Sequence, residues 1–104
     1  MNPDKLLRRI KSLLSEPFGD RLRRVVLYGS EARGTAQPDS DIDLLVLLDG
    51  PIQYGDDLET AIAAVHPFSE ELERRISVKP VDVEEYAKAD CPLYRAARRD
   101  GIAA

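Results

Sequence analysis

Two aspartates that stand one residue apart are the part of this sequence best suited to chemistry. Asp41 and Asp43 begin an apolar run that extends to Leu48. Alternate side chains of a strand point to the same face, so we expect both carboxylates on one face and Ile42 and Leu44 in the core. At a separation of about 5 Å the two charges repel by about 3 kcal/mol, at an effective dielectric constant of about 20, unless a cation lies between them. The pair therefore predicts a metal site.

The available ligand types indicate which metal this is. Hard divalent cations prefer carboxylate oxygens, whereas the single histidine, His66, and the single cysteine, Cys91, are both distant from the pair in sequence. We therefore expect Mg²⁺ or Mn²⁺ rather than zinc. Because Mg²⁺ is usually held by one or two carboxylates together with substrate phosphates, the pair also predicts that a nucleoside triphosphate binds here.

Gly29 and Ser30 precede the aspartates and are suited to holding phosphates. They follow a short apolar run at an expected strand-to-helix junction. There a glycine lets a phosphate approach the backbone, and the first N–H groups of a helix attract an anion. The Ser30 hydroxyl adds a donor, and Arg33 is a further candidate phosphate contact, with pairing to a nearby acid as its alternative. The segment from Gly29 to Gly34 fits neither a dinucleotide-binding G-x-G-x-x-G motif nor a P-loop.

The same residues also have a purely structural interpretation. In it, Asp41 and Asp43 are solvated acids at a loop-to-strand junction, Ser30 caps a helix and Gly34 ends it. The spacing between the glycine–serine pair and the aspartates favours the functional interpretation of the aspartates. For Gly34 we favour the structural one.

Taken together, Gly29–Ser30, ten intervening residues and Asp41–Ile42–Asp43 resemble the signature of the minimal nucleotidyltransferases of the DNA polymerase beta superfamily. Further matching positions are Ala32, Arg33, Gly34, Ser40 and Leu44. The resemblance implies an α/β (α+β) fold, a small mixed β-sheet flanked by helices like the polymerase palm. It also implies an enzyme, a nucleotidyltransferase with Mg²⁺ or Mn²⁺ as cofactor and ATP as nucleotide donor. Asp41 and Asp43 would then be catalytic metal ligands, with Gly29, Ser30 and Arg33 binding the nucleotide.

Members of this family usually carry a third carboxylate on a later strand. The resemblance makes Asp82 the candidate here, as a third metal ligand or as the catalytic base. Asp82 lies between Val81 and Val83, so we expect it to face away from the core, as the aspartate pair does. Relatives of this compact type often have an apolar residue near that position, and Pro80 leaves the strand register open. An ordinary acid on an edge strand is the alternative.

The resemblance also suggests a partner. Small nucleotidyltransferases of this type often accompany a helical HEPN-domain toxin, a ribonuclease, and act as its antitoxin by transferring AMP to one of its tyrosines. The chain has no room for an acceptor domain, so the acceptor should come from another polypeptide or from a homo-oligomer of this one. Two alternatives remain. One is an inactive binding module that neutralises its partner by occlusion, and the other is transfer to a small molecule or a nucleic acid.

The elements that must position these residues follow from periodicity and turn signals. Asn2 can cap a helix that begins at Pro3, carries an apolar stripe and ends at Pro17 and Gly19. Residues 25–28 are expected to form a buried strand, residues 30–33 a helical turn, and residues 41–48 a second strand.

The second half of the chain is expected to alternate in the same way. A helix capped by Asp56 or Asp57 should break or kink at Pro67 and restart at Ser69. Residues 76–83 predict a third strand, which Pro80 assigns to an edge or a bulge. Residues 84–89 and 92–99 predict two short helices. Strand direction does not follow from these patterns.

Composition limits the remaining classes. With 104 residues we expect one domain spanning residues 1–104. The net charge of −4 and the pI near 5.0 disfavour broad binding to nucleic-acid phosphates. The apolar runs are far shorter than the roughly 20 residues that cross a bilayer, and the first ten residues lack the apolar centre of a signal peptide. We therefore expect a cytoplasmic protein that does not enter membranes.

Overall fold

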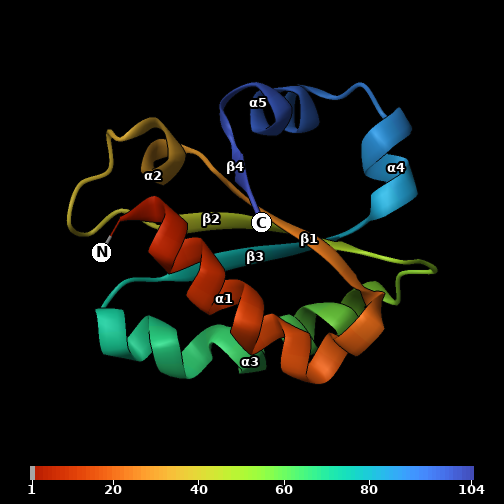
Figure 1. The fold of residues 1–104 in the computed structure, drawn as a ribbon, viewed down its shortest axis with the longest axis horizontal. Helices are drawn as coiled ribbons and strands as arrows, with labels where there is room; N and C mark the ends of the chain where they lie inside the picture. The colour runs from red at the N-terminus through yellow and green to blue at the C-terminus, as the bar shows by residue number, and fades with distance from the viewer. Residues whose placement is uncertain (1) are drawn as a thin grey trace.

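The computed structural model describes residues 2–104 and contains a four-stranded mixed sheet with the strand order β3-β2-β1-β4 (Figure 1). Strands β1 and β2 are antiparallel, β1 and β4 are antiparallel, and β2 and β3 are parallel. The strands are β1 (Leu22–Tyr28), β2 (Ile42–Leu48), β3 (Ile76–Asp82) and β4 (Ile102–Ala103). The expected small mixed sheet is confirmed.

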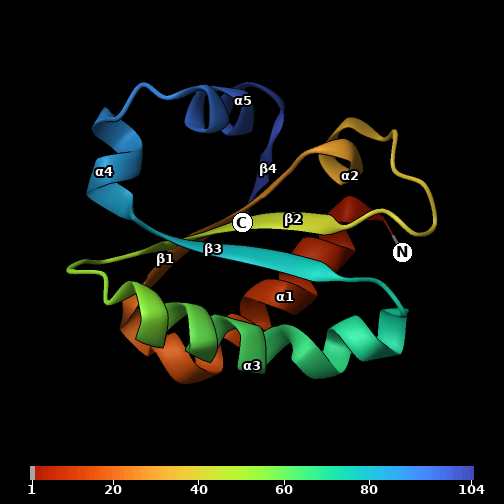
Figure 2. The same cartoon turned by 180° about the vertical axis from the view of Figure 1, so that it is seen from behind.

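Helices cover both faces of this sheet. Figures 1 and 2 show α1 and α3 on one face and α2, α4 and α5 on the other. The helices are α1 (Pro3–Phe18), α2 (Ser30–Arg33), α3 (Tyr54–Leu72), α4 (Val83–Lys88) and α5 (Pro92–Asp100), with a single 3₁₀ turn, η1 (Gly19–Arg21), before β1. None of the helices in residues 2–104 is both long enough and apolar enough to span a membrane.

Helix α1 forms as its sequence predicts at its beginning and differs slightly at its end. The Asn2 side chain accepts a hydrogen bond from the Lys5 N–H at 2.8 Å, as an N-cap should. Pro17 does not end the helix, which continues to Phe18, where Gly19 caps it with a φ of 55°. Phe18 is buried against the core, so packing holds the last turn despite the N–H that proline lacks.

Helix α3 contradicts the expected interruption. It runs without a break through Pro67, and its N-cap is Gln53 rather than Asp56 or Asp57. Val65 and Phe68, on either side of the proline, are buried in the core. Their burial outweighs the roughly 3 kcal/mol that an internal proline costs a helix. The helix that we expected in two parts is therefore one continuous element.

The sheet separates two apolar cores. Ile42, Leu44, Val46 and Leu48 pack beneath α1 and α3, which confirms the predicted direction of Ile42 and Leu44. The second core packs under α4 and α5, and its buried members are Val26, Leu45, Leu47, Val81, Tyr94 and Ala97. Strand β2 is therefore buried on both faces.

Strand β3 lies at the edge of the sheet, as Pro80 predicted. It is one residue shorter than expected, because Val83 is the first residue of α4. The Asp82 carboxylate causes this change by accepting hydrogen bonds from the N–H groups of Glu84 and Glu85, which begins a helix.

Candidate active site

The two motifs meet at one end of the β1–β2 pair. Because these strands are antiparallel, the end of β1 lies beside the start of β2, and Tyr28 pairs directly with Asp43. Gly29 then turns the chain into α2, whose first residue is Ser30. Asp41 immediately precedes β2 and is exposed. The glycine–serine pair and the aspartates therefore lie at the same sheet end.

Gly29 and Asp43 are in close contact. Gly29 has a φ of 75° and a ψ of −154°, a conformation that is essentially limited to glycine. A Cβ atom at this position would lie 2.6 Å from Oδ2 of Asp43. Because Gly29 has no side chain, the Asp43 carboxylate has room to lie beside the Gly29 backbone.

The surroundings of Asp43 make ionisation of its carboxyl group less favourable than for an ordinary aspartate. Burial and then repulsion by Asp41 raise the pKa of Asp43, and the positive charge of Arg33 opposes them. Burial and the Asp43 charge also raise the pKa of Tyr28, the residue opposite on β1. A cation placed between the carboxylates would relieve the repulsion that the sequence predicted.

The structure confirms one of the two capping roles that the sequence suggested for α2 and contradicts the other. Gly29, not Ser30, stands at the N-cap position, so the capping interpretation of Ser30 is wrong. Gly34 is the left-handed C-cap with a φ of 75°, which confirms its structural interpretation. Arg33 is exposed and acts on Asp43 through its charge.

The structure does not bring Asp82 to the aspartate pair. In the parallel β2–β3 register, Asp43 pairs with Ser77, whereas Asp82 pairs with Leu48, five positions further along. That interval corresponds to about 17 Å of strand. Leu48 belongs to the core beneath α1 and α3, so Asp82 also occupies a position on the opposite face. We had expected Asp82 on the same face as the aspartate pair. Instead Val81 packs in the second core, so the next residue, Asp82, takes the opposite face. A face away from the core does not exist here, because both faces of the sheet are buried.

Sequence reasoning missed the residue that occupies the corresponding place. Ser77 is the β3 neighbour of Asp43 and is half-buried. The β3 neighbour of Asp43 therefore adds no carboxylate to the pair Asp41 and Asp43. In residues 2–104, no three His, Cys, Asp or Glu side chains come together as a metal-binding group. The parallel register identifies Ser77, and no local pattern in the sequence does.

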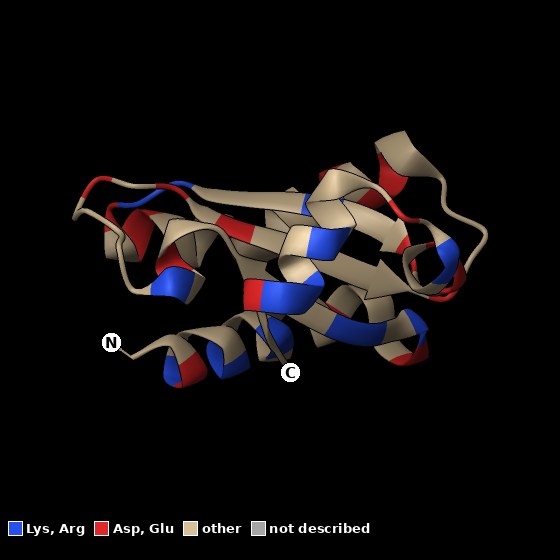
Figure 3. Ribbon diagram, turned by 90° about the horizontal axis from the view of Figure 1, so that it is seen from above, with Lys and Arg blue, Asp and Glu red and all other residues tan. Residues whose placement is uncertain are grey.

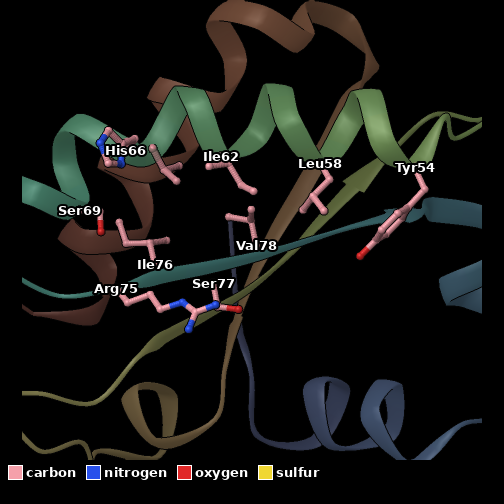
Figure 4. Close-up of a pocket in the computed structure, with 10 residues that line it drawn as sticks. Tyr54, Leu58, Ile62, His66, Ser69, Arg75, Ile76, Ser77 and Val78 are labelled. Carbon is pink, nitrogen blue, oxygen red and sulfur yellow. The ribbon is translucent and has the colours of Figure 1, made fainter.

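A groove runs along the open side of β3, between this strand and α3 (Figure 4). Ile76 and Val78 point towards α3, whereas Arg75 and Ser77 lie on the other side of β3. The exposed side chain of Ile62 lines the groove from α3. The groove thus reaches the strand that flanks Asp43.

The donor set fits a hard divalent cation. Asp41 and Asp43 supply oxygen ligands, and the raised pKa of Asp43 reflects a local excess of negative charge in a partly buried place. Two carboxylates leave coordination positions for phosphate oxygens and water, which is the usual arrangement for Mg²⁺.

A small mixed sheet with a glycine–serine turn and an aspartate pair at one end defines a class of nucleotide-handling domains. The nucleotidyltransferase domain model matches residues 7–102. The chain belongs to this family.

Individual relatives match this chain over a shorter stretch than the family model does. A "putative protein adenylyltransferase" of Methanocaldococcus jannaschii is 34% identical over 62 residues, which are 60% of this chain and 62% of that protein. A second protein of that description from the same organism is 48% identical over 44 residues, 42% of this chain and 27% of the relative. The matches thus span less than two thirds of these relatives.

Solved structures share the fold over nearly the whole chain. A chain from a crystal structure of a toxin–antitoxin with AMP-PNP superposes with a TM-score of 0.64 and 18% identity, covering 99% of this chain and 72% of the other. A structure described as a "putative minimal nucleotidyltransferase" gives a TM-score of 0.57 and 26% identity, covering 98% of this chain and 95% of the other.

Proposed function

We propose that this protein is a Mg²⁺-dependent nucleotidyltransferase that moves AMP from ATP to a hydroxyl group of a partner protein. The observation that carries this proposal is the contact between Gly29 and Asp43, which unites the glycine–serine turn and the aspartate pair in one site. The family match supports the reaction class.

The mechanism assigns a role to each residue of the site. Asp41 and Asp43 would hold Mg²⁺ when it is bound, while the Gly29 backbone, the Ser30 hydroxyl and Arg33 orient the phosphates of the nucleotide. When bound, Mg²⁺ would supply positive charge that offsets the charge developing on the phosphate oxygens. The acceptor oxygen bonds to the α-phosphorus, the bond from that phosphorus to the bridging oxygen breaks, and pyrophosphate leaves. The hydroxyl proton passes to water.

A protein acceptor is favoured over the other classes. The M. jannaschii relatives are described as protein adenylyltransferases, and a structural neighbour is a toxin–antitoxin. We therefore propose that the acceptor is a helical HEPN-domain toxin and that this chain is its antitoxin. The net charge of −4 disfavours a nucleic-acid acceptor. Both acidic and basic residues occur along the helices and loops of the ribbon in Figure 3.

Intact-mass spectrometry tests this function directly. The purified protein is incubated with Mg²⁺ and each nucleoside triphosphate, alone and together with the protein encoded beside it. We expect the neighbour to gain the mass of one AMP, and the Asp41→Asn/Asp43→Asn variant to abolish the gain. A mass gain on this chain itself would instead identify a second copy as the acceptor.

A non-catalytic binding module is the second candidate. It is favoured by one observation, that the β3 position beside Asp43 carries the hydroxyl of Ser77 rather than a carboxylate. The same double variant separates the two functions. Neutralisation of the partner by occlusion would survive the loss of both carboxylates, whereas neutralisation by AMP transfer would not.

A further inference from the structure

We infer that Arg74 is a positioning residue that holds the two halves of the active site together. This inference rests on the proposed function for its catalytic meaning. The Arg74 side chain donates from Nη2 to Oε1 of Glu31 at 2.6 Å. It also donates to the Ser40 carbonyl oxygen, from Nε at 3.0 Å and from Nη2 at 2.9 Å.

The two acceptors belong to the two separate motifs. Glu31 follows Ser30 in α2, and the Ser40 carbonyl belongs to the peptide bond that leads into Asp41. The chain between them, from Gly34 to Ser40, is mainly an exposed loop. One guanidinium group therefore links the phosphate-orienting turn to the backbone that places the aspartates.

Arg74 is itself held in place by the end of α3. Its N–H donates to the Ser69 carbonyl at 3.2 Å, and its carbonyl accepts a hydrogen bond from the Ser69 hydroxyl at 2.5 Å. Glu73, the C-cap of α3, adopts a left-handed φ of 54° and turns the chain at this point. The continuous α3 thus supplies a rigid base for a side chain that reaches 34 residues back to Ser40.

The ion pair also controls charge near the phosphates. The side chains of Arg74 and Glu31 are only 18% and 13% exposed, so solvent screens them weakly. Without Arg74, the Glu31 carboxylate would be an uncompensated negative charge one residue from Ser30. That charge would repel a triphosphate, so Arg74 both positions the loop and masks a repulsive group.

Arginine is needed for this geometry. Its planar group presents several N–H donors in a fixed fork, whereas lysine offers one compact ammonium group on a flexible stem. We expect Arg74→Lys to retain the charge compensation and lose the simultaneous hold on Glu31 and Ser40.

The chain offers a matched control at the other end of the sheet. Arg21 donates to both carboxylate oxygens of Asp57 at 3.0 Å and to the Pro51 carbonyl at 3.3 Å. With a further hydrogen bond from Nε to the Asp49 carbonyl at 3.3 Å, it joins one carboxylate to backbone carbonyls, much as Arg74 does, but it precedes β1 and lies away from Gly29 and Asp43. Arg21→Gln should therefore reproduce the loss of stability without affecting the site.

The experiment measures binding and local protection in parallel. Mn²⁺ binding in the presence of α,β-methylene-ATP is followed by electron paramagnetic resonance, and amide hydrogen exchange is followed for residues 40–43. All variants are measured well below their unfolding temperatures. We expect Arg74→Gln to weaken nucleotide-dependent Mn²⁺ binding by about tenfold or more, which corresponds to about 1.4 kcal/mol. Exchange of residues 40–43 should also accelerate, while Arg21→Gln leaves both unchanged.

A double-mutant cycle tests the charge role of the pair. Adding Glu31→Gln to the Arg74→Gln variant should recover part of the lost nucleotide affinity, because the repulsive carboxylate is then absent. Equal effects of Arg74→Gln and Arg21→Gln on both readouts would overturn the inference, as would wild-type binding and exchange in Arg74→Gln. If Arg74→Gln does not fold, Arg74→Lys takes its place.

The two readouts separate this inference from the proposed function. If the wild-type protein does not bind Mn²⁺ with the nucleotide analogue, the proposed function fails. Exchange of residues 40–43 then decides alone whether Arg74 holds the loop. Acceleration specific to Arg74 variants would support the positioning role, and its absence would overturn it.

Discussion

The Asp43 carboxylate occupies the space that a side chain at Gly29 would need, because a Cβ atom on Gly29 would lie 2.6 Å from Oδ2 of Asp43. Two motifs that stand more than ten residues apart in the chain therefore approach each other too closely for a side chain at Gly29. Two independent features therefore require glycine at position 29: the backbone conformation and the nearby Asp43 carboxylate.

Replacing Gly29 by alanine should damage both stability and the site. The backbone conformation, with a φ of 75° and a ψ of −154°, costs a non-glycine residue about 1–3 kcal/mol. The new methyl group also displaces the Asp43 carboxylate. We expect a lower free energy of unfolding in urea and a loss of Mn²⁺ binding.

Gly34→Ala is the matched control for this change. Gly34 has the same φ of 75°, but nothing lies within 4 Å of its Cβ position. It should lose about 1–2 kcal/mol of stability and retain Mn²⁺ binding. Equal metal binding by the two alanine variants would contradict the steric role of Gly29.

Ionised Asp43 should destabilise the metal-free protein. Burial and repulsion by Asp41 raise the pKa of Asp43 in the folded state, so the folded protein holds this proton more tightly than the unfolded chain does. The contribution of Asp43 to the free energy of unfolding should therefore decrease as the pH rises from the ordinary aspartate pKa of about 3.9 through the raised value, and then stay constant.

Asp43→Asn isolates this contribution. In the absence of metal, the variant should have a higher unfolding temperature than the wild type at pH 7, and the difference should narrow as the pH falls. Thermal unfolding of both proteins between about pH 4 and 8 provides the measurement. Added Mg²⁺ and ATP should stabilise only the wild type. A less stable metal-free variant at pH 7 would contradict the assigned cause of the shift.

Asp82 should matter for stability and not for nucleotide transfer. Its carboxylate caps α4 through the N–H groups of Glu84 and Glu85. Asp82→Ala should lower the free energy of unfolding by about 1 kcal/mol, and Asp82→Asn should preserve the cap. Both variants should modify the partner at the wild-type rate per folded molecule. Loss of transfer in a fully folded Asp82→Asn protein would return Asp82 to the active site.

The buried Asp57 should contribute more to stability than the exposed Asp49. Hydrogen bonding to Arg21 lowers the pKa of Asp57, so its stabilisation is present above the ordinary aspartate pKa and is lost as the pH falls through the lowered value. At pH 7, Asp57→Ala should cost about 2 kcal/mol. Asp49→Ala, which removes an exposed pair with Arg23, should cost less than about 1 kcal/mol. Chemical denaturation at pH 7 measures both.

Part of the candidate site around Gly29 and Asp43 was predictable from the sequence. The alternation of side chains along a strand assigned Ile42 and Leu44 to the core, and the structure confirms them there. That the turn after β1 meets the start of β2 follows from the antiparallel pairing of these strands, which the sequence patterns left open. Asn2 capped its helix as expected, since a cap depends on neighbours within one turn.

The remaining features depended on contacts between distant segments. Ser77 lies beside Asp43, and Asp82 lies elsewhere, because the parallel register of β2 and β3 depends on side-chain packing across the sheet. The proline in α3 was accommodated because Val65 and Phe68 are buried around it. Arg74 reaches Glu31 and Ser40 only after α3 has packed against the sheet. Helix caps and side-chain alternation could be predicted because they depend on neighbours in the chain, whereas the strand register and the contacts between distant elements depend on how the whole chain packs.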